Sequence, residues 1–132
     1  MLSFSVETTH TLPEAEAIVR EQLASVGFGI LSEIDLGATL AAKLNRSVGN
    51  MKILGACNPQ FAYDAITSDR SIALLLPCNV VLDATETGTR VSVPAPEALL
   101  PGRAEITQPV TALLMQALTA MGTVTSTPPS PA

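Results

Sequence analysis

The stretch Met51-Lys52-Ile53-Leu54-Gly55-Ala56-Cys57-Asn58-Pro59 carries the strongest local signals in the chain. Residues 51–57 are apolar at every position except Lys52, and a strand that is apolar on both faces usually lies inside a sheet. Asn58 and Pro59 are favoured at the cap and at the first position of a helix. The stretch therefore predicts a central strand that leads directly into a helix.

Four more strands are predicted on either side of this stretch. Apolar alternation and short apolar runs place them at residues 2–7, 28–34, 78–82 and 90–93. The last two flank a short polar loop that contains a glycine, which is typical of a β-hairpin.

Helices are predicted where a capping residue precedes an apolar stripe, as it does at Thr11, Asp35 and Asn58. A last helix has apolar residues at helical spacing from Val110 to Met121. We expect it to begin at Thr107 or Gln108, with Pro109 in its first turn.

Together these elements predict one α+β domain over residues 1–122. Strands and helices do not alternate strictly, because a hairpin interrupts the series. A two-layer sandwich fits best, with one mixed or antiparallel sheet of about five strands and helices packed mainly on one face. Residues 123–132 are rich in Pro, Ser and Thr, and predict a flexible tail.

Composition excludes several classes of protein. The chain of 132 residues is 47% apolar and 14% charged, which excludes intrinsic disorder. A net charge of −5 and an aromatic content of 3% argue against a nucleic-acid partner. Residues 1–7 lack the basic segment and the apolar run expected of a signal peptide, and the longest apolar run, residues 72–77, is far shorter than the roughly 20 residues of a membrane span. We therefore expect a cytoplasmic protein without a membrane partner, whose cysteines are reduced.

The dipeptide Cys-Asn occurs twice, as Cys57-Asn58 and Cys78-Asn79. Cys57 ends a predicted strand before a helix N-terminus, and Cys78 begins another strand. If the two strands are neighbours, both thiols lie at one end of the sheet. The candidate ligand-binding residues are Cys57, Asn58, Pro59, Cys78, Asn79 and Lys52.

Such a cluster has a chemical rationale. Backbone N–H groups at a helix start favour an anion and lower the pKa of a nearby thiol. The Asn side chains offer donors and acceptors, and Lys52 would add a positive charge if it reached the same end. The chemistry would suit a thiol nucleophile, an anion pocket or a soft-metal site with Cys57 and Cys78 as ligands.

A purely structural interpretation explains the same residues. Free cysteine is often buried as a small apolar side chain. Asn58 is sufficiently explained as a helix cap and Asn79 as a turn residue after Pro77. Two cysteines without a nearby histidine or a second pair are a weak metal signal.

Three segments of the chain resemble the signature blocks of domain-of-unknown-function family 302. They are GFGILSEID (residues 27–35), ILGACNP (residues 53–59) and LLPCNVV (residues 75–81). The resemblance implies a small α+β sandwich, often a dimer, and no established activity. Its signature residues include Cys57, Asn58, Pro59, Pro77, Cys78 and Asn79, which the local chemistry had already singled out.

Three functions remain open at this point, and none specifies a cofactor. The first is a binding module for a small ligand or a soft metal at the Cys-Asn cluster. The second is a thiol enzyme or redox sensor, with Cys57 as nucleophile and Cys78 as resolving partner; the single histidine, His10, is distant in sequence. The third is an interaction protein that acts as a homodimer and merely buries both cysteines.

Overall fold

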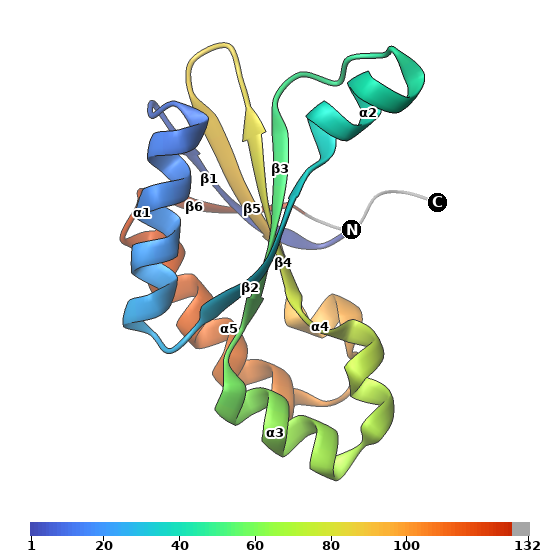
Figure 1. The fold of residues 1–132 in the computed structure, drawn as a ribbon. Coiled ribbons are helices and arrows are strands. Elements are labelled where there is room, and N and C mark those ends of the chain that lie inside the picture. Colours follow the sequence, from blue (N-terminus) through green and yellow to red (C-terminus); the bar gives the residue numbers. More distant parts are fainter. Residues whose placement is uncertain (128–132) are drawn as a thin grey trace.

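The structure is a computed structural model that describes residues 1–127 (Figure 1). Its centre is one six-stranded sheet in the order β2-β3-β4-β5-β1-β6, antiparallel at every pairing. The strands are β1 (Ser3–Thr8), β2 (Gly29–Asp35), β3 (Met51–Cys57), β4 (Cys78–Ala84), β5 (Thr89–Pro94) and β6 (Val124–Thr127). The predicted α+β class is confirmed, and the stretch that begins at Met51 does form an interior strand.

Five α-helices and one 3-10 helix connect these strands. They are α1 (Leu12–Ser25), α2 (Leu36–Leu44), α3 (Pro59–Ser68), the 3-10 helix η1 (Arg70–Leu75), α4 (Pro96–Leu99) and α5 (Ala104–Thr119). The capping side chains expected from the sequence are in place: Thr11 forms a capping box with Glu14, and Asp35 accepts from the Ala38 N–H.

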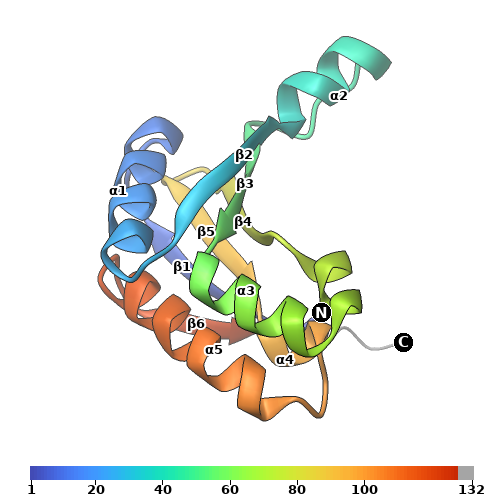
Figure 2. The same cartoon turned by 60° about the horizontal axis from the view of Figure 1, so that its bottom comes forward.

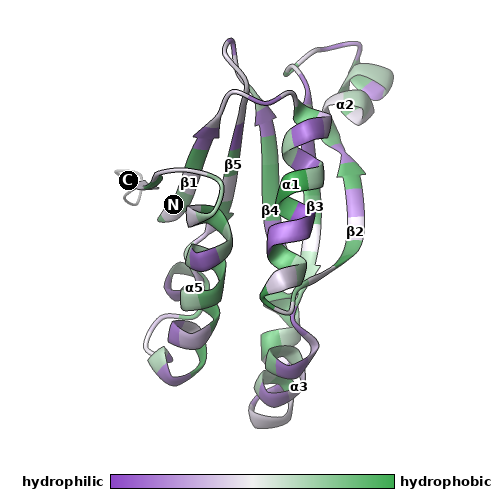
Figure 3. Ribbon diagram, turned by 90° about the vertical axis from the view of Figure 1, so that its left-hand side faces the viewer, coloured by the Kyte–Doolittle hydropathy of each residue, from purple (hydrophilic) through white to green (hydrophobic). Residues whose placement is uncertain are grey.

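Helices α1 and α5 cover one face of the sheet (Figure 3). The buried apolar residues of each helix share one face, namely Ala15, Val19 and Leu23 in α1 and Leu114, Ala117 and Leu118 in α5, so each helix presents one apolar stripe. The side chains on the covered face of the sheet alternate with those on the open face. The fully buried core residues are Val6, Ala15, Val19, Leu23, Leu54, Ala56, Val80, Leu82, Val91, Leu114, Ala117 and Leu118.

The C-terminal segment differs from the prediction. Residues Val124–Thr127 form β6, which pairs with the free edge of β1 in the register Val6↔Val124. The prediction of a tail from residue 123 is therefore wrong for these residues, because the edge of β1 offers backbone partners to a short segment rich in β-branched residues. The rest of the predicted tail, residues 128–132, lies outside the described residues.

The segment before the last helix also differs. The helix α5 begins at Ala104 rather than at Thr107 or Gln108, so Pro109 lies inside it. The Thr107 N–H donates to the Arg103 carbonyl, which adds a turn ahead of the apolar stripe. Residues Pro96–Leu99, which precede α5, form the short helix α4.

Two arms extend beyond the end of the sheet where β3 ends and β4 begins (Figure 2). The first arm, here called the α3–η1 arm, comprises residues 59–75. The second, the α4–α5 arm, comprises residues 96–110 and includes the start of α5. Helix α2 projects from the opposite end of the sheet, so it is remote from both arms (Figure 1).

Candidate functional site

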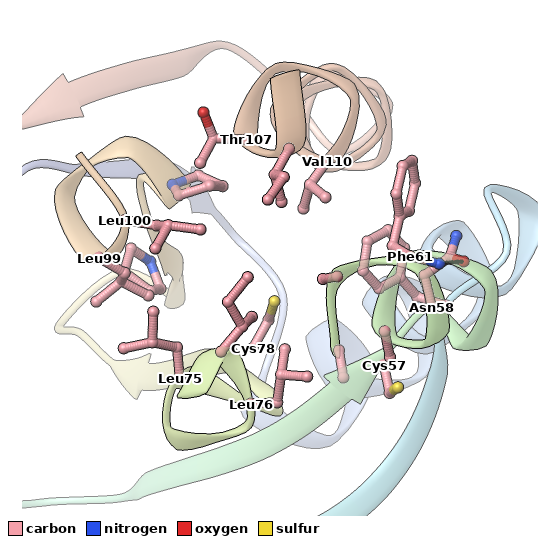
Figure 4. A pocket seen from close by; sticks show the side chains of 18 residues that line it. Cys57, Asn58, Phe61, Leu75, Leu76, Cys78, Leu99, Leu100, Thr107 and Val110 are labelled. Atoms are coloured by element: carbon pink, nitrogen blue, oxygen red, sulfur yellow. Dashed lines mark hydrogen bonds between the residues drawn. The ribbon is translucent and has the colours of Figure 1, made fainter. Parts of the chain in front are cut away.

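An apolar cavity lies between the two arms, where they meet the end of the sheet (Figure 4). Its free volume is about 80 Å³, which exceeds what one water molecule occupies. The lining residues are Phe28, Ala56, Cys57, Asn58, Phe61, Ala62, Ala65, Ile72, Leu75, Leu76, Cys78, Pro94, Pro96, Leu99, Leu100, Ile106, Thr107 and Val110. Several of them are only half-buried, so the cavity opens to solvent.

The two cysteines both border this cavity, but their side chains diverge. Strands β3 and β4 are neighbours, with Ala56 opposite Cys78. Cys78 therefore shares the covered face with Ala56, whereas Cys57, the next residue, points to the other side of the strand. Figure 4 shows the sulfur of Cys78 turned toward the cavity and that of Cys57 turned away. The structure brings the cysteines to one end of the sheet and does not turn their sulfurs toward each other; both are free thiols.

The surroundings of Cys78 disfavour a thiolate. Burial, and to a smaller extent the charge of a Cys57 thiolate, raises the pKa of Cys78 above its ordinary value of 9.0. His10 lies at the other end of the sheet, where its carbonyl accepts from the Thr89 hydroxyl. Cys78 therefore contributes a neutral thiol to the wall of the cavity.

Asn58 performs a local structural task. Its Oδ1 accepts a hydrogen bond of 3.3 Å from the Phe61 N–H, which caps α3, and Pro59 occupies the first turn. Its amide also lies against Gly27, which has a φ of +91°: a Cβ at Gly27 would come 2.9 Å from Asn58 Nδ2. The first and second signature blocks therefore meet through this contact.

Gly55 connects the second and third blocks in a similar way. A Cβ at this position would collide with Ser32 Oγ and would lie 2.7 Å from the Pro77 ring. The absence of a side chain at Gly55 allows the Leu76-Pro77 turn, with its cis peptide bond, to lie across β3. This close approach is a physical reason for glycine there.

Lys52 does not belong to this site, which corrects the expectation from the sequence. It lies five residues before Cys57 on β3, and an extended chain of that length spans about 16 Å. Its Nζ forms ion pairs with Glu16 Oε1 at 2.8 Å and Glu33 Oε1 at 2.6 Å, and Arg20 contacts the same two carboxylates. Burial opposes ionisation of Glu16, but the hydrogen bonds from Lys52 and Arg20 outweigh it and lower the pKa of Glu16. Lys52 thus holds α1 onto β2 and β3.

Asn79 lies on the open face of the sheet, on the other side of β4 from Cys78. Its side chain is exposed and makes no hydrogen bond within residues 1–127. It borders a second cavity, which is lined by Met1, Leu74, Leu75, Leu76, Pro77, Asn79, Pro94 and Leu99. The side chain of Asn79 and the first cavity therefore lie on opposite faces of the sheet.

The described part of the chain contains no group of three or more His, Cys, Asp or Glu side chains placed to hold a metal ion. Cys57 and Cys78 would be a two-ligand set, and their side chains lie on different sides of β3 and β4. Nor is any helix among residues 1–127 long and apolar enough to cross a membrane.

The sequence interpretation missed most of the cavity wall. Leu75, Leu99 and Val110 come from three separate segments whose leucines and valine resemble ordinary core residues. Thr107 is buried and its hydroxyl has no partner within the described residues, but Figure 4 shows that hydroxyl turned away from the middle of the cavity. The wall contains few polar groups and no charged side chain.

One ion pair links the two arms. Arg103, which precedes α5, places a guanidinium nitrogen 3.8 Å from Oδ2 of Asp69, the cap of η1. The same guanidinium contacts Glu105 at 2.6 Å. Because this pair is exposed, its contribution to stability is small.

An open antiparallel sheet with helices on one face and an apolar cavity at its end defines the class of this protein as an α+β sandwich. The family model described as Domain of unknown function DUF302 matches residues 4–121. The chain belongs to that family, as its three signature blocks had indicated. No curated protein matches the chain.

The fold also recurs in a solved structure, the crystal structure of an uncharacterized conserved DUF302 protein from Bacillus stearothermophilus. The two chains are 25% identical, the match covers 90% of this chain and 97% of the other, and the TM-score is 0.84. The predicted sandwich is thus confirmed, while neither comparison assigns an activity.

Proposed function

We propose that this protein is a binding module for a small apolar molecule, or for the apolar part of a larger one, held in the cavity between the two arms. The observation that carries the proposal is the cavity itself: a wall of aliphatic and aromatic side chains that opens to solvent and contains few polar groups. Ligand sites are typically concave and apolar with a small number of polar groups.

In this proposal the Cys-Asn cluster forms and shapes part of the cavity wall and is not itself the main set of ligand-binding groups. Cys78 contributes a neutral thiol to the cavity wall, and Asn58 shapes the start of α3. A soft-metal site is less well supported, because two diverging thiols with no third donor make a poor ligand set. A thiol enzyme with Cys57 as nucleophile and Cys78 as resolving partner is also less well supported, because the two sulfurs do not turn toward each other and the sulfur of Cys57 turns away from the cavity.

An NMR titration with benzene tests the proposal. Benzene should cause saturable shifts of backbone amides around Ala65, Cys78 and Val110. The variant Ala65→Phe places a ring in the cavity and should weaken binding at least tenfold. Its matched control is Ala98→Phe, the same change at an exposed position of α4 outside the cavity wall, which should bind as the wild type does.

A second filling variant guards against misfolding of the first. Val110→Phe fills the cavity from the opposite arm and should also weaken benzene binding while the circular dichroism spectrum stays native. Absence of saturable shifts in the folded wild type would refute the proposal. Benzene binding by both filled variants with the affinity of the wild type would also refute it.

We further propose that the protein forms a homodimer through the end of the molecule that carries α2. This helix projects away from the core, and three large apolar side chains at that end are half or more exposed: Ile34 (50%), Leu44 (62%) and Val48 (51%). Exposed apolar patches commonly mark protein interfaces. Sedimentation should give a dimer that Leu44→Glu converts to a monomer; a wild-type monomer at high concentration would refute this assignment.

The cytoplasmic location expected from the sequence is likewise a proposal. Free thiols at Cys57 and Cys78 suit a reducing compartment. Fractionation of cells followed by detection of the protein would test it, and recovery outside the cytoplasm would contradict it.

A further inference from the structure

The two cavities at the end of the sheet lie on opposite sides of it and share a wall. The side chains of Cys78 and Asn79 lie on opposite faces because neighbouring residues of a strand alternate. Cys78 borders the cavity on the covered face and Asn79 the cavity on the open face. The third signature block therefore contributes to both.

Four residues line both cavities: Leu75, Leu76, Pro94 and Leu99. They come from η1 and the turn after it, from the end of β5 and from α4. All four are half-buried. The two cavities therefore adjoin at these side chains, at the end of the sheet.

The cavities differ in polarity. The first has almost no polar wall, whereas the second has Asn79, whose amide offers a donor and an acceptor and has no partner within residues 1–127. An exposed amide with unused hydrogen-bonding capacity beside an apolar cavity wall suits the polar end of an amphipathic molecule.

We infer that the ligand is a linear amphipathic molecule with an aliphatic chain and a hydrogen-bonding head group. The chain lies in the cavity beside Cys78 and Val110, passes Leu75 and Leu99, and places its head group on Asn79. This inference rests on the proposed function, to which it adds the chemical class of the ligand and a polar subsite.

Binding of 1-octanol and of benzene to wild type and Asn79→Leu tests the inference. Leucine has a similar size and removes the amide. Loss of one neutral hydrogen bond should weaken octanol binding about three- to tenfold. Benzene has no head group, so its affinity should stay within about twofold. The control Asn50→Leu makes the same change at the opposite end of the sheet and should alter neither affinity.

The outcomes separate the two proposals. Selective loss of octanol affinity in Asn79→Leu supports the polar subsite. Equal octanol binding by wild type and Asn79→Leu overturns the subsite and leaves the apolar cavity intact. Failure of both octanol and benzene to bind the folded wild type overturns the proposed function together with the subsite.

Discussion

The two Cys-Asn segments are identical as dipeptides and different in the structure. In the first, Asn58 is committed to the cap of α3 and Cys57 turns its sulfur away from the cavity. In the second, Cys78 faces one cavity and Asn79 borders another, and the Asn79 side chain makes no hydrogen bond within residues 1–127. The first segment shapes the site and the second is available to a ligand. A repeated motif therefore need not have a repeated role.

The largest expected effect concerns the contact that holds the two segments together. Gly55→Val should lower the free energy of unfolding by about 2–3 kcal/mol, because its side chain would collide with Ser32 and the Pro77 ring. Chemical denaturation measures the change. The control is Gly29→Val, whose Cβ meets no atom within 4 Å and which should change stability by less than about 0.5 kcal/mol. Equal effects of both substitutions would contradict the close packing at Gly55.

The next effect tests whether Lys52 belongs to the site. Lys52→Met should cost about 1–2 kcal/mol of stability, because it leaves Glu16 partly buried without one of its two cationic partners, and should leave benzene affinity unchanged. The exposed Lys43, replaced in the same way, should have almost no effect. Weaker benzene binding by folded Lys52→Met would show that Lys52 does contribute to the site.

The ion pairs of Glu16 with Lys52 and Arg20 predict that the free energy of unfolding depends on pH. The pKa of Glu16 is lower in the folded state than its ordinary value of 4.5, so the folded state binds fewer protons. The stabilisation is complete above that value and is lost as the pH falls through the folded pKa. Glu16→Gln should therefore flatten the acid side of the stability profile.

The third effect compares the two asparagines directly. Asn58→Ala should lower the free energy of unfolding by about 1 kcal/mol, because the cap of α3 is lost, whereas Asn79→Ala should change it by less than about 0.5 kcal/mol. Thermal or chemical unfolding of both variants gives the difference. A larger loss at Asn79 would reverse the roles assigned to the two segments.

The smallest effect concerns the Cys78 thiol. Because its pKa is raised above 9.0, the folded state holds the proton more tightly than the unfolded chain does. Its contribution to stability is complete below that pH and is lost as the pH rises through the folded pKa. Wild type should therefore lose stability relative to Cys78→Ala as the pH rises above 9.0. The opposite sign would show that the site stabilises a thiolate.

Local signals predicted much of this fold. The apolar run before Asn58-Pro59 and the caps at Thr11 and Asp35 each specify a nearby element, because capping and strand patterns depend on neighbouring residues. The strand β6 was missed because four residues give little pattern, and its stability comes from the free edge of β1.

The site was less predictable because it depends on register and on distant segments. Cys78 lies opposite Ala56 and not opposite Cys57, so the two thiols lie on different sides of the sheet. The two Cys-Asn dipeptides do not encode this offset of one residue. Leu75, Leu99 and Val110 meet only after the arms fold. The wrong assignment of Lys52 to the site, by contrast, was avoidable from strand length alone, since five extended residues separate Lys52 from Cys57.

Soaking crystals of the protein in bromobenzene would locate a ligand in the cavity, because the anomalous signal of bromine reports position without interpretation of weak density. A bromine site is expected between Cys78 and Val110, absent in Ala65→Phe and retained in Ala98→Phe. A cavity without bromine in well-ordered, soaked wild-type crystals, or the same site in Ala65→Phe, would contradict a ligand-binding role for the space between the arms.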